Sequence, residues 1–216
     1  MVVGERYQFL SNMPDETVFE VDSFWAKPCR AYHVQHEPDQ ASIRQITELQ
    51  DQIEATGARE LHRMPVLSLH MTVLTLFPAT ASVATHDEAL WSQHKEKWLE
   101  RIGDVCASTR PVAVELNSIR ATSRAIILRG DESEDLKQFR KKIVTAVSLP
   151  GWKPTPPNIA HISLFRYARS KLQLETLTSI HRCDFVTKTH LTGIAVVQER
   201  RYPSLERIFL QRFALG

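Results

Sequence analysis

Two histidines of this chain are each followed, two positions later, by a hydroxyl residue within a mostly apolar run. His70 and Thr72 lie in LSLHMTVLTL, and His161 and Ser163 lie in NIAHISLFRY. Side chains of a β-strand alternate between two faces, so the histidine and the hydroxyl of each motif would share a face. An imidazole with its ordinary pKa of about 6.5 exchanges a proton near neutral pH, and a hydroxyl can donate a hydrogen bond to an anion. These residues predict general acid–base chemistry on an anionic group such as a phosphodiester.

The spacing by itself is weakly specific. The chain has nine histidines, so about one match to H-x-[ST] is expected by chance, and a third match occurs at His190. His70 and His161 differ from His190 in context, because each closes a strand–helix–strand unit of the same layout. We therefore expect His70 and His161 to act together and His190 to lie elsewhere.

Hydrophobic periodicity predicts the elements that position these motifs. The helices are expected to begin at capping residues such as Asp39 and Ser133. We expect helices over 39–57, 86–106 and 133–151, and strands over 29–35, 67–76, 111–121, 123–130 and 158–167. Residues 185–213 are expected to form a hairpin of two longer strands that turns near Pro203.

The two motifs belong to an internal repeat. The first copy consists of RAYHV, a helix and LHMTV, and the second copy consists of RAIIL, a helix and AHISL. There are 39 positions from Ala31 to His70 and 36 from Ala125 to His161. The pattern predicts an α+β fold that is duplicated into two lobes, with mostly antiparallel sheets forming a central cleft and helices packed outside. We expect an N-terminal arm over 1–27 and a single bilobal domain over 28–216.

The composition is that of an ordinary soluble protein. Of the 216 residues, 43% are hydrophobic and 24% are charged, and the net charge is only +2. A charge this small argues against a broad nucleic-acid footprint, so any nucleic-acid substrate should be a short piece or an end. The sequence has no apolar run long enough for a membrane helix and no secretory signal. Its three scattered cysteines predict neither a disulfide scaffold nor a zinc site, and we expect a cytoplasmic monomer.

The paired motifs, one in each lobe, resemble the 2H phosphoesterase superfamily, which includes RNA ligase-like 2′,3′-cyclic phosphodiesterases and eukaryotic cyclic nucleotide phosphodiesterases. SLHMTV and HISLFRY, with FRKKIV before the second, look closest to a poorly characterised branch. The resemblance implies hydrolysis of a 2′,3′-cyclic phosphate on a nucleotide or RNA end, without metal or cofactor. It also implies that His161 activates water and that His70 protonates the leaving oxygen. Thr72 and Ser163 would donate hydrogen bonds to the phosphate.

Four further residues are candidates for contact with the substrate. The resemblance implies that Arg166 contacts phosphate, although strict alternation would turn it away from His161 unless the strand has a bulge. Tyr167 is in phase with His161 and could stack a base or pack in the core. Ser68 is in phase with His70, and Tyr32 could reach the cleft from the first strand.

Other polar residues allow more than one interpretation. The basic cluster at 199–201, together with Arg207, could be a solvated hairpin face or the rim of the cleft. His33 and His36 are three positions apart on an expected strand, so they should face opposite ways and not share a metal ion.

Two alternative functions remain open at this point. The chain could be a non-catalytic module that binds a nucleotide or an RNA end. It could also be a 2H enzyme that acts on 2′,5′-linked or other signalling oligonucleotides, or a 3′-end exonuclease, since the same acid–base pair serves each reaction.

Overall fold

The computed structural model describes residues 19–56, 60–80, 85–172, 180 and 185–216. Its helices are α2 (Gln40–Glu54), α3 (Thr85–Ala107) and α4 (Glu134–Val147). Its strands are β1 (Pro28–His36), β2 (Leu61–Arg63), β3 (Met71–Thr80), β4 (Val112–Leu116), β5 (Ser118–Ala121), β6 (Ala125–Gly130), β7 (Ala160–Tyr167), β8 (Thr187–Leu191), β9 (Gly193–Arg201) and β10 (Glu206–Ala214).

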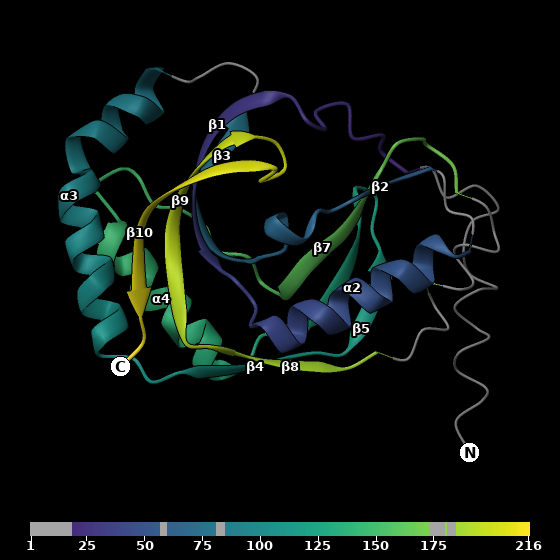
Figure 1. Ribbon diagram of the computed structural model, residues 1–216. Coiled ribbons are helices and arrows are strands. Elements are labelled where there is room, and N and C mark those ends of the chain that lie inside the picture. Colours follow the sequence, from purple (N-terminus) through teal and green to yellow (C-terminus); the bar gives the residue numbers. More distant parts are fainter. Residues whose placement is uncertain (1–18, 57–59, 81–84, 173–179, 181–184) are drawn as a thin grey trace.

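Eight of these strands form one sheet (Figure 1). The strand order is β10-β9-β1-β3-β7-β6-β5, with β2 alongside β7, and β4 and β8 form a separate two-stranded sheet. All pairs of neighbouring strands are antiparallel. Figure 1 shows α2 and α3 at opposite sides of the molecule, and α3 packs against α4 and β10. The architecture confirms the predicted α+β fold with mostly antiparallel sheets.

The predicted repeat corresponds to two strand–helix–strand units. We call β1, α2 and β3 the first unit and β6, α4 and β7 the second unit. In each unit the two strands pair with each other. The units meet where β3 pairs with β7, and the register there contains the single pair Met71–Ile162.

The helices of the two units begin and bury their apolar faces as the sequence predicts. Asp39 caps α2 by accepting a hydrogen bond from the Ser42 backbone N–H (2.8 Å), and Ser133 caps α4 in the same way with Leu136 (3.2 Å). The buried apolar residues recur at helical spacing on one face of each helix: Ile46, Leu49 and Ile53 in α2, and Leu136, Phe139, Ile143 and Val147 in α4. These faces anchor both units in the core.

Three predicted strand boundaries are wrong. The strand expected over 67–76 begins only at Met71, because residues Val66–Ser68 form a 3₁₀ turn after Pro65. The segment 111–121 divides at Asn117 into β4 and β5, which belong to different sheets. The tail contains three strands, because the chain turns at Thr192 and Gly193 between β8 and β9. A Cβ atom at Gly193, the first residue of β9, would lie 2.7 Å from the Phe213 carbonyl oxygen of β10, so the close approach of β10 favours a glycine here.

The described part of the expected arm packs along the sheet. Phe19 is buried, and its ring lies 4.4 Å from that of Tyr167. At the other end of this segment, the Ala26 backbone N–H donates to the Tyr202 carbonyl (2.8 Å). The segment therefore connects the end of β7 to the β9–β10 hairpin. Within the described residues, no helix is long and apolar enough to cross a membrane.

Candidate active site

The junction of the two units brings the two motifs together. In an antiparallel pair the register continues on both sides of Met71–Ile162, so His70 faces Ser163 and Thr72 faces His161 across the junction. Met71 and Ile162 are both 1% exposed, whereas the four motif residues are half-buried. The four side chains therefore share the face that is turned away from the core. Their arrangement allows both imidazoles and both hydroxyls to address one small group.

The 3₁₀ turn fixes the orientation of the His70 ring. His70 Nδ1 lies 2.7 Å from the Ser68 carbonyl oxygen. Because a carbonyl can only accept a hydrogen bond, Nδ1 must carry the proton and donate it, which leaves Nε2 available for chemistry. The Ser68 side chain is buried, and its contribution to this geometry is the backbone carbonyl.

Burial and nearby cations lower the pKa of His70. Burial is the largest cause, and the charges of Arg207 and His33 add to it, while the Ser68 carbonyl and Glu199 oppose it. The resulting pKa of His70 is about 3. His70 is therefore neutral at pH 7 in the unliganded protein.

His161 is neutral at pH 7 for similar reasons. Burial lowers its pKa most, followed by the charges of Arg140 and Arg166, and the Ile159 carbonyl opposes the shift. Its Nδ1 is buried, with no hydrogen-bond partner among the described residues. Arg207 thus lies near His70, and Arg140 and Arg166 lie near His161, an arrangement that favours binding of an anion.

A β-bulge in β7 decides the directions of Arg166 and Tyr167. Ile126 pairs with Phe165 but Ile127 pairs with Ser163, so Leu164 is the extra residue. The bulge reverses the alternation and turns Arg166 to the face of His161, as its expected use requires. The Arg166 Nε lies 4.0 Å from an Asp22 carboxylate oxygen.

The same bulge places Tyr167 in the core, so the prediction that it could stack a base is wrong. Tyr167 is 0% exposed, and its hydroxyl donates to the Thr122 carbonyl (2.8 Å). Burial raises the pKa of this hydroxyl far above its ordinary value.

The prediction that Tyr32 reaches the cleft is also wrong. Tyr32 is 3% exposed, stacks on Trp91 of α3 (4.4 Å between ring centroids) and donates a hydrogen bond to Glu88 (3.1 Å). The next residue, His33, takes the face toward His70. Its Nδ1 shares a hydrogen bond with the Thr75 hydroxyl (3.2 Å).

Sequence reasoning missed a buried polar network beside His70. His33 Nε2 lies 3.5 Å from Glu199, which accepts a hydrogen bond from Ser204 (2.8 Å). Burial alone would raise the pKa of Glu199, but His33, Ser204 and Cys29 lower it below its ordinary value. Arg207 belongs to the same region, because its side chain is only 7% exposed and donates to Gln35 (2.6 Å). The one signal of this network in the sequence is a set of polar residues inside otherwise apolar strands.

Arg129 was missed as well. It lies directly opposite His161 in the pairing of β6 with β7, and its side chain has no ion-pair partner among the described residues. Residues opposite each other in neighbouring strands point to the same face, so Arg129 is a further cation on the face of His161.

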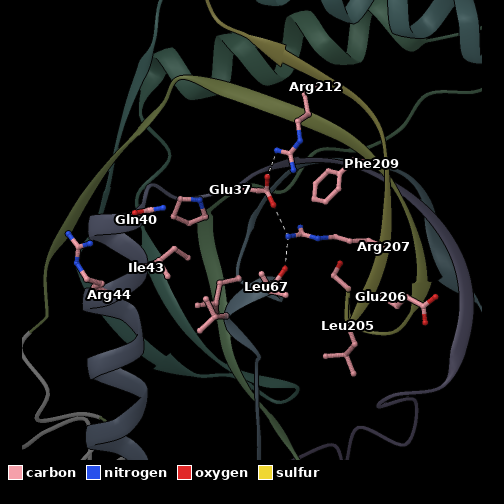
Figure 2. Close-up of a pocket in the computed structure, with 14 residues that line it drawn as sticks. Glu37, Gln40, Ile43, Arg44, Leu67, Leu205, Glu206, Arg207, Phe209 and Arg212 are labelled. Atoms are coloured by element: carbon pink, nitrogen blue, oxygen red, sulfur yellow. Dashed lines mark hydrogen bonds and ion pairs between the residues drawn. The ribbon is translucent and has the colours of Figure 1, made fainter.

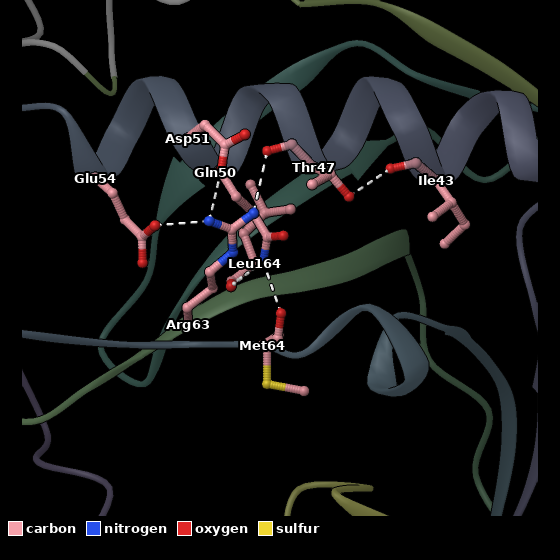
Figure 3. Close-up of polar contacts among 8 residues, drawn as sticks. All are labelled: Ile43, Thr47, Gln50, Asp51, Glu54, Arg63, Met64 and Leu164. Carbon is pink, nitrogen blue, oxygen red and sulfur yellow. Dashed lines mark hydrogen bonds and ion pairs between the residues drawn. The ribbon is translucent and has the colours of Figure 1, made fainter.

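Two buried polar residues of the helices connect the units across the junction. Arg140 of α4 donates to the Thr72 carbonyl in β3 (2.9 Å). Gln50 of α2 donates to the Leu164 carbonyl in β7 (2.9 Å) and to the Met64 carbonyl (3.0 Å), as Figure 3 shows. Each helix therefore binds the motif strand of the other unit, which holds β3 and β7 together beyond their single register pair.

The described residues contain no group of three His, Cys, Asp or Glu side chains that could hold a metal ion. His33 and His36 have different partners, since His36 Nδ1 donates to the Gly193 carbonyl (3.0 Å) while His33 binds Thr75 and Glu199. The third motif histidine, His190, lies in the β4–β8 sheet opposite Ala113, as expected away from the other two.

Several solved structures are similar to this fold. TT0787 of Thermus thermophilus has a TM-score of 0.59 and 18% identity, over 86% of this chain and 97% of that chain. E. coli LigT complexed with 3′-AMP has a TM-score of 0.58 and 13% identity, over 88% and 99% of the two chains. The MHV ns2 PDE domain has a TM-score of 0.51 and 15% identity, over 80% and 99%. At these identities the likeness shows a common fold.

A search of curated protein sequences found no match to this chain. The family model of the 2′-5′ RNA ligase superfamily matches residues 37–203, a segment that contains both histidine motifs and most of both strand–helix–strand units. The resemblance to 2H phosphoesterases is therefore confirmed, and the chain belongs to the 2′-5′ RNA ligase superfamily.

Proposed function

We propose that this protein is a metal-independent phosphodiesterase that opens a 2′,3′-cyclic phosphate on a nucleotide or RNA end. The observation that supports the proposal is the antiparallel pair Met71–Ile162, whose register, extended by one residue on each side, puts His70 opposite Ser163 and Thr72 opposite His161. Support for a nucleotide substrate comes from similar structures, since E. coli LigT has been solved with 3′-AMP and with phosphate.

The reaction needs one proton acceptor and one proton donor on opposite sides of phosphorus. His161 takes a proton from water, whose oxygen forms a bond to phosphorus. The bond between phosphorus and the leaving ribose oxygen breaks, and that oxygen takes a proton from His70 Nε2. The product is a phosphomonoester, and return of one proton from His161 to His70 through solvent resets the site.

The remaining groups stabilise the charge that grows on the phosphate. The hydroxyls of Thr72 and Ser163 donate hydrogen bonds to the non-bridging oxygens, and the guanidinium of Arg166 adds a positive charge. Fixed donors of this kind act most strongly in the transition state. The phosphate also offsets the cations beside the histidines, which raises the pKa values of both rings and allows His70 to hold the proton it must give.

The test is hydrolysis of 2′,3′-cyclic AMP in the presence of EDTA. We expect His70→Ala and His161→Ala each to lower kcat on the order of 10²-fold or more, the usual contribution of a general acid or base. His190→Ala is the matched control, because it removes a histidine of the same motif from a different sheet. Its activity should equal that of the wild type, and thermal unfolding of all variants should be similar.

Loss of activity in EDTA, or full activity of both histidine variants, would refute the proposal. Binding of the cyclic nucleotide without formation of product would instead favour the non-catalytic module. Product from 2′,5′-linked dinucleotides with none from the cyclic phosphate would favour an enzyme for signalling oligonucleotides.

A further inference from the structure

Arg166 has a charged partner in the chain segment that precedes β1. The Oδ2 atom of Asp22 lies 4.0 Å from the Arg166 Nε atom, and the two side chains are 9% and 17% exposed. Both atoms are buried, and neither has a hydrogen-bond partner among the described residues. A buried charge is costly without a charge of opposite sign nearby, so the carboxylate and the guanidinium stabilise each other.

The position of the Asp22 carboxylate is fixed by backbone hydrogen bonds. The Asp22 N–H donates to the Tyr167 carbonyl at the end of β7 (2.9 Å), and the Asp22 carbonyl accepts from the Trp25 N–H (3.0 Å). The Oδ1 atom accepts a hydrogen bond from the Phe24 N–H (3.2 Å). With Oδ1 used in this turn, Oδ2 is the oxygen that faces Arg166.

Aromatic side chains hold the surroundings of Arg166 in place. Tyr202, in the turn between β9 and β10, has its ring centre 5.5 Å from the guanidinium carbon of Arg166. Trp25 stacks on His62 with 4.6 Å between the ring centroids, and His62 lies opposite Arg166 in the pairing of β2 with β7. A guanidinium gains from an aromatic face as well as from a carboxylate. The N-terminal segment and the β9–β10 hairpin therefore meet at this arginine.

The other two arginines that lower the pKa of a motif histidine are also paired with a carboxylate. Arg207 binds Glu37 (2.8 Å), as Figure 2 shows. Arg140 binds Glu132 (2.6 Å). Both of these carboxylates lie within the part of the chain that matches the family model, whereas Asp22 lies before it. A carboxylate partner restricts the direction of the planar guanidinium in each case.

We infer that Asp22 is a positioning residue, which holds the Arg166 guanidinium toward the phosphate. The inference rests on the proposed function and gives the described part of the expected N-terminal arm a role in it. A long arginine side chain is flexible, so one that is held before the substrate binds loses less freedom when it stabilises the transition state.

The variant Asp22→Asn tests this role, because it removes the charge but keeps an oxygen that can accept from the Phe24 N–H. In hydrolysis of 2′,3′-cyclic AMP in EDTA, kcat should fall on the order of tenfold without a rise in KM, since the arginine keeps its charge but loses its fixed direction. Glu20→Gln is the matched control. Glu20 is an acidic residue of the same segment, is 56% exposed and pairs with Arg124 outside the site, so its removal should leave kcat unchanged.

A double variant separates positioning from a general effect on the structure. If Asp22 acts through Arg166, adding Asp22→Asn to Arg166→Met should cause no further loss of kcat. Losses that multiply in the double variant would overturn the inference, and so would an unchanged kcat in Asp22→Asn alone.

The hold on the side chain is measured without turnover by NMR of the arginine Nε–H groups. The signal of Arg166 is identified by its absence in Arg166→Met. Its hydrogen exchange should become faster on the order of tenfold in Asp22→Asn and stay unchanged in Glu20→Gln, because the buried ion pair protects the Nε–H. Equal exchange in the wild type and in Asp22→Asn would overturn the inference, even if the cyclic nucleotide is hydrolysed. Faster exchange in a protein without hydrolytic activity would support Asp22 as the residue that holds Arg166 and would reject the proposed reaction.

Discussion

His70 and His161 are prepared for chemistry by the same two physical effects. Burial lowers both pKa values, and arginines lower them further, Arg207 at His70 and Arg140 and Arg166 at His161. Both rings are therefore neutral without a substrate. A bound phosphate offsets these cations and restores a proton to the site, so binding of the anion and uptake of a proton should be coupled.

This coupling predicts the pH dependence of the reaction. Activity of the free enzyme requires one protonated and one neutral histidine, and both pKa values are lowered from about 6.5. The profile of kcat/KM should therefore be bell-shaped with its maximum below pH 6.5. The profile of kcat, which reports the complex, should lie at higher pH. Steady-state kinetics in EDTA over a range of pH would check this, and a maximum of kcat/KM above pH 7 would contradict it.

Arg166 should act on both binding and protonation. The variant Arg166→Met lacks the positive charge that Arg166 places near the phosphate and near His161. The pKa of His161 should therefore rise. We expect kcat/KM to fall on the order of 10²-fold and its pH profile to move to higher pH. Arg124→Met is the matched control, because Arg124 is exposed and pairs with Glu20 outside the site. A fall in activity without any change in the profile would reject an effect on His161.

At the scale of elements, the junction depends on side chains of the helices as well as on strand pairing. Gln50 and Arg140 donate to carbonyls in the opposite unit, where β3 and β7 share one register pair. Backbone carbonyls in a protein interior need hydrogen-bond partners, so these two polar residues are part of the fold although they lie on apolar helix faces.

Gln50→Leu should therefore destabilise the protein. The substitution leaves the Met64 carbonyl without its side-chain donor and removes one donor from the Leu164 carbonyl, which costs about 1–3 kcal/mol of the free energy of unfolding. Gln52→Leu is the matched control, since Gln52 is exposed on the same helix. Urea unfolding of both variants measures the difference. Equal stability of the two variants would show that the Gln50 contacts do not hold the junction.

The sequence predicted the features that depend on local patterns. The two motifs, the helices with their caps at Asp39 and Ser133, and the repeat all follow from spacing within a short window. A role for Arg166 at the phosphate requires a bulge in this strand, but the sequence does not show where the bulge lies. Its position at Leu164 is visible only in the pairing of β6 with β7. Strict alternation put the Tyr167 side chain on the face of His161, and this prediction is wrong because the bulge reverses the alternation before Tyr167.

The missed site residues depend on contacts between distant segments. His33 meets Glu199, 166 positions later in the chain, because β1 lies between β3 and β9 in the sheet. Arg207 reaches the His70 region only because β10 folds back on β9. Periodicity identifies a strand but not its neighbour, so such clusters cannot be assembled from one sequence.

At the scale of the whole molecule, the fold keeps several buried histidines in the uncharged form, because burial of a charge costs free energy. Burial lowers the pKa values of His36, His70 and His161 below the ordinary value for histidine. Unfolding returns each ring to a pKa of about 6.5, so between that value and the lowered one the unfolded chain binds more protons than the native protein. The free energy of unfolding must therefore fall as the pH falls below about 6.5.

The contribution of His36 can be separated from activity, because His36 lies outside the proposed site. Its ring is 3% exposed, and burial outweighs the opposing effects of the Gly193 carbonyl, Asp39 and Glu37 on its pKa. Between its lowered pKa and about 6.5, each such histidine contributes up to about 1.4 kcal/mol per pH unit to the slope of stability. His36→Gln should reduce this slope in urea unfolding between pH 6.5 and about 4.5, with little effect on kcat. An unchanged slope would mean that His36 takes up its proton in the native protein as readily as in the unfolded chain, which its buried position argues against.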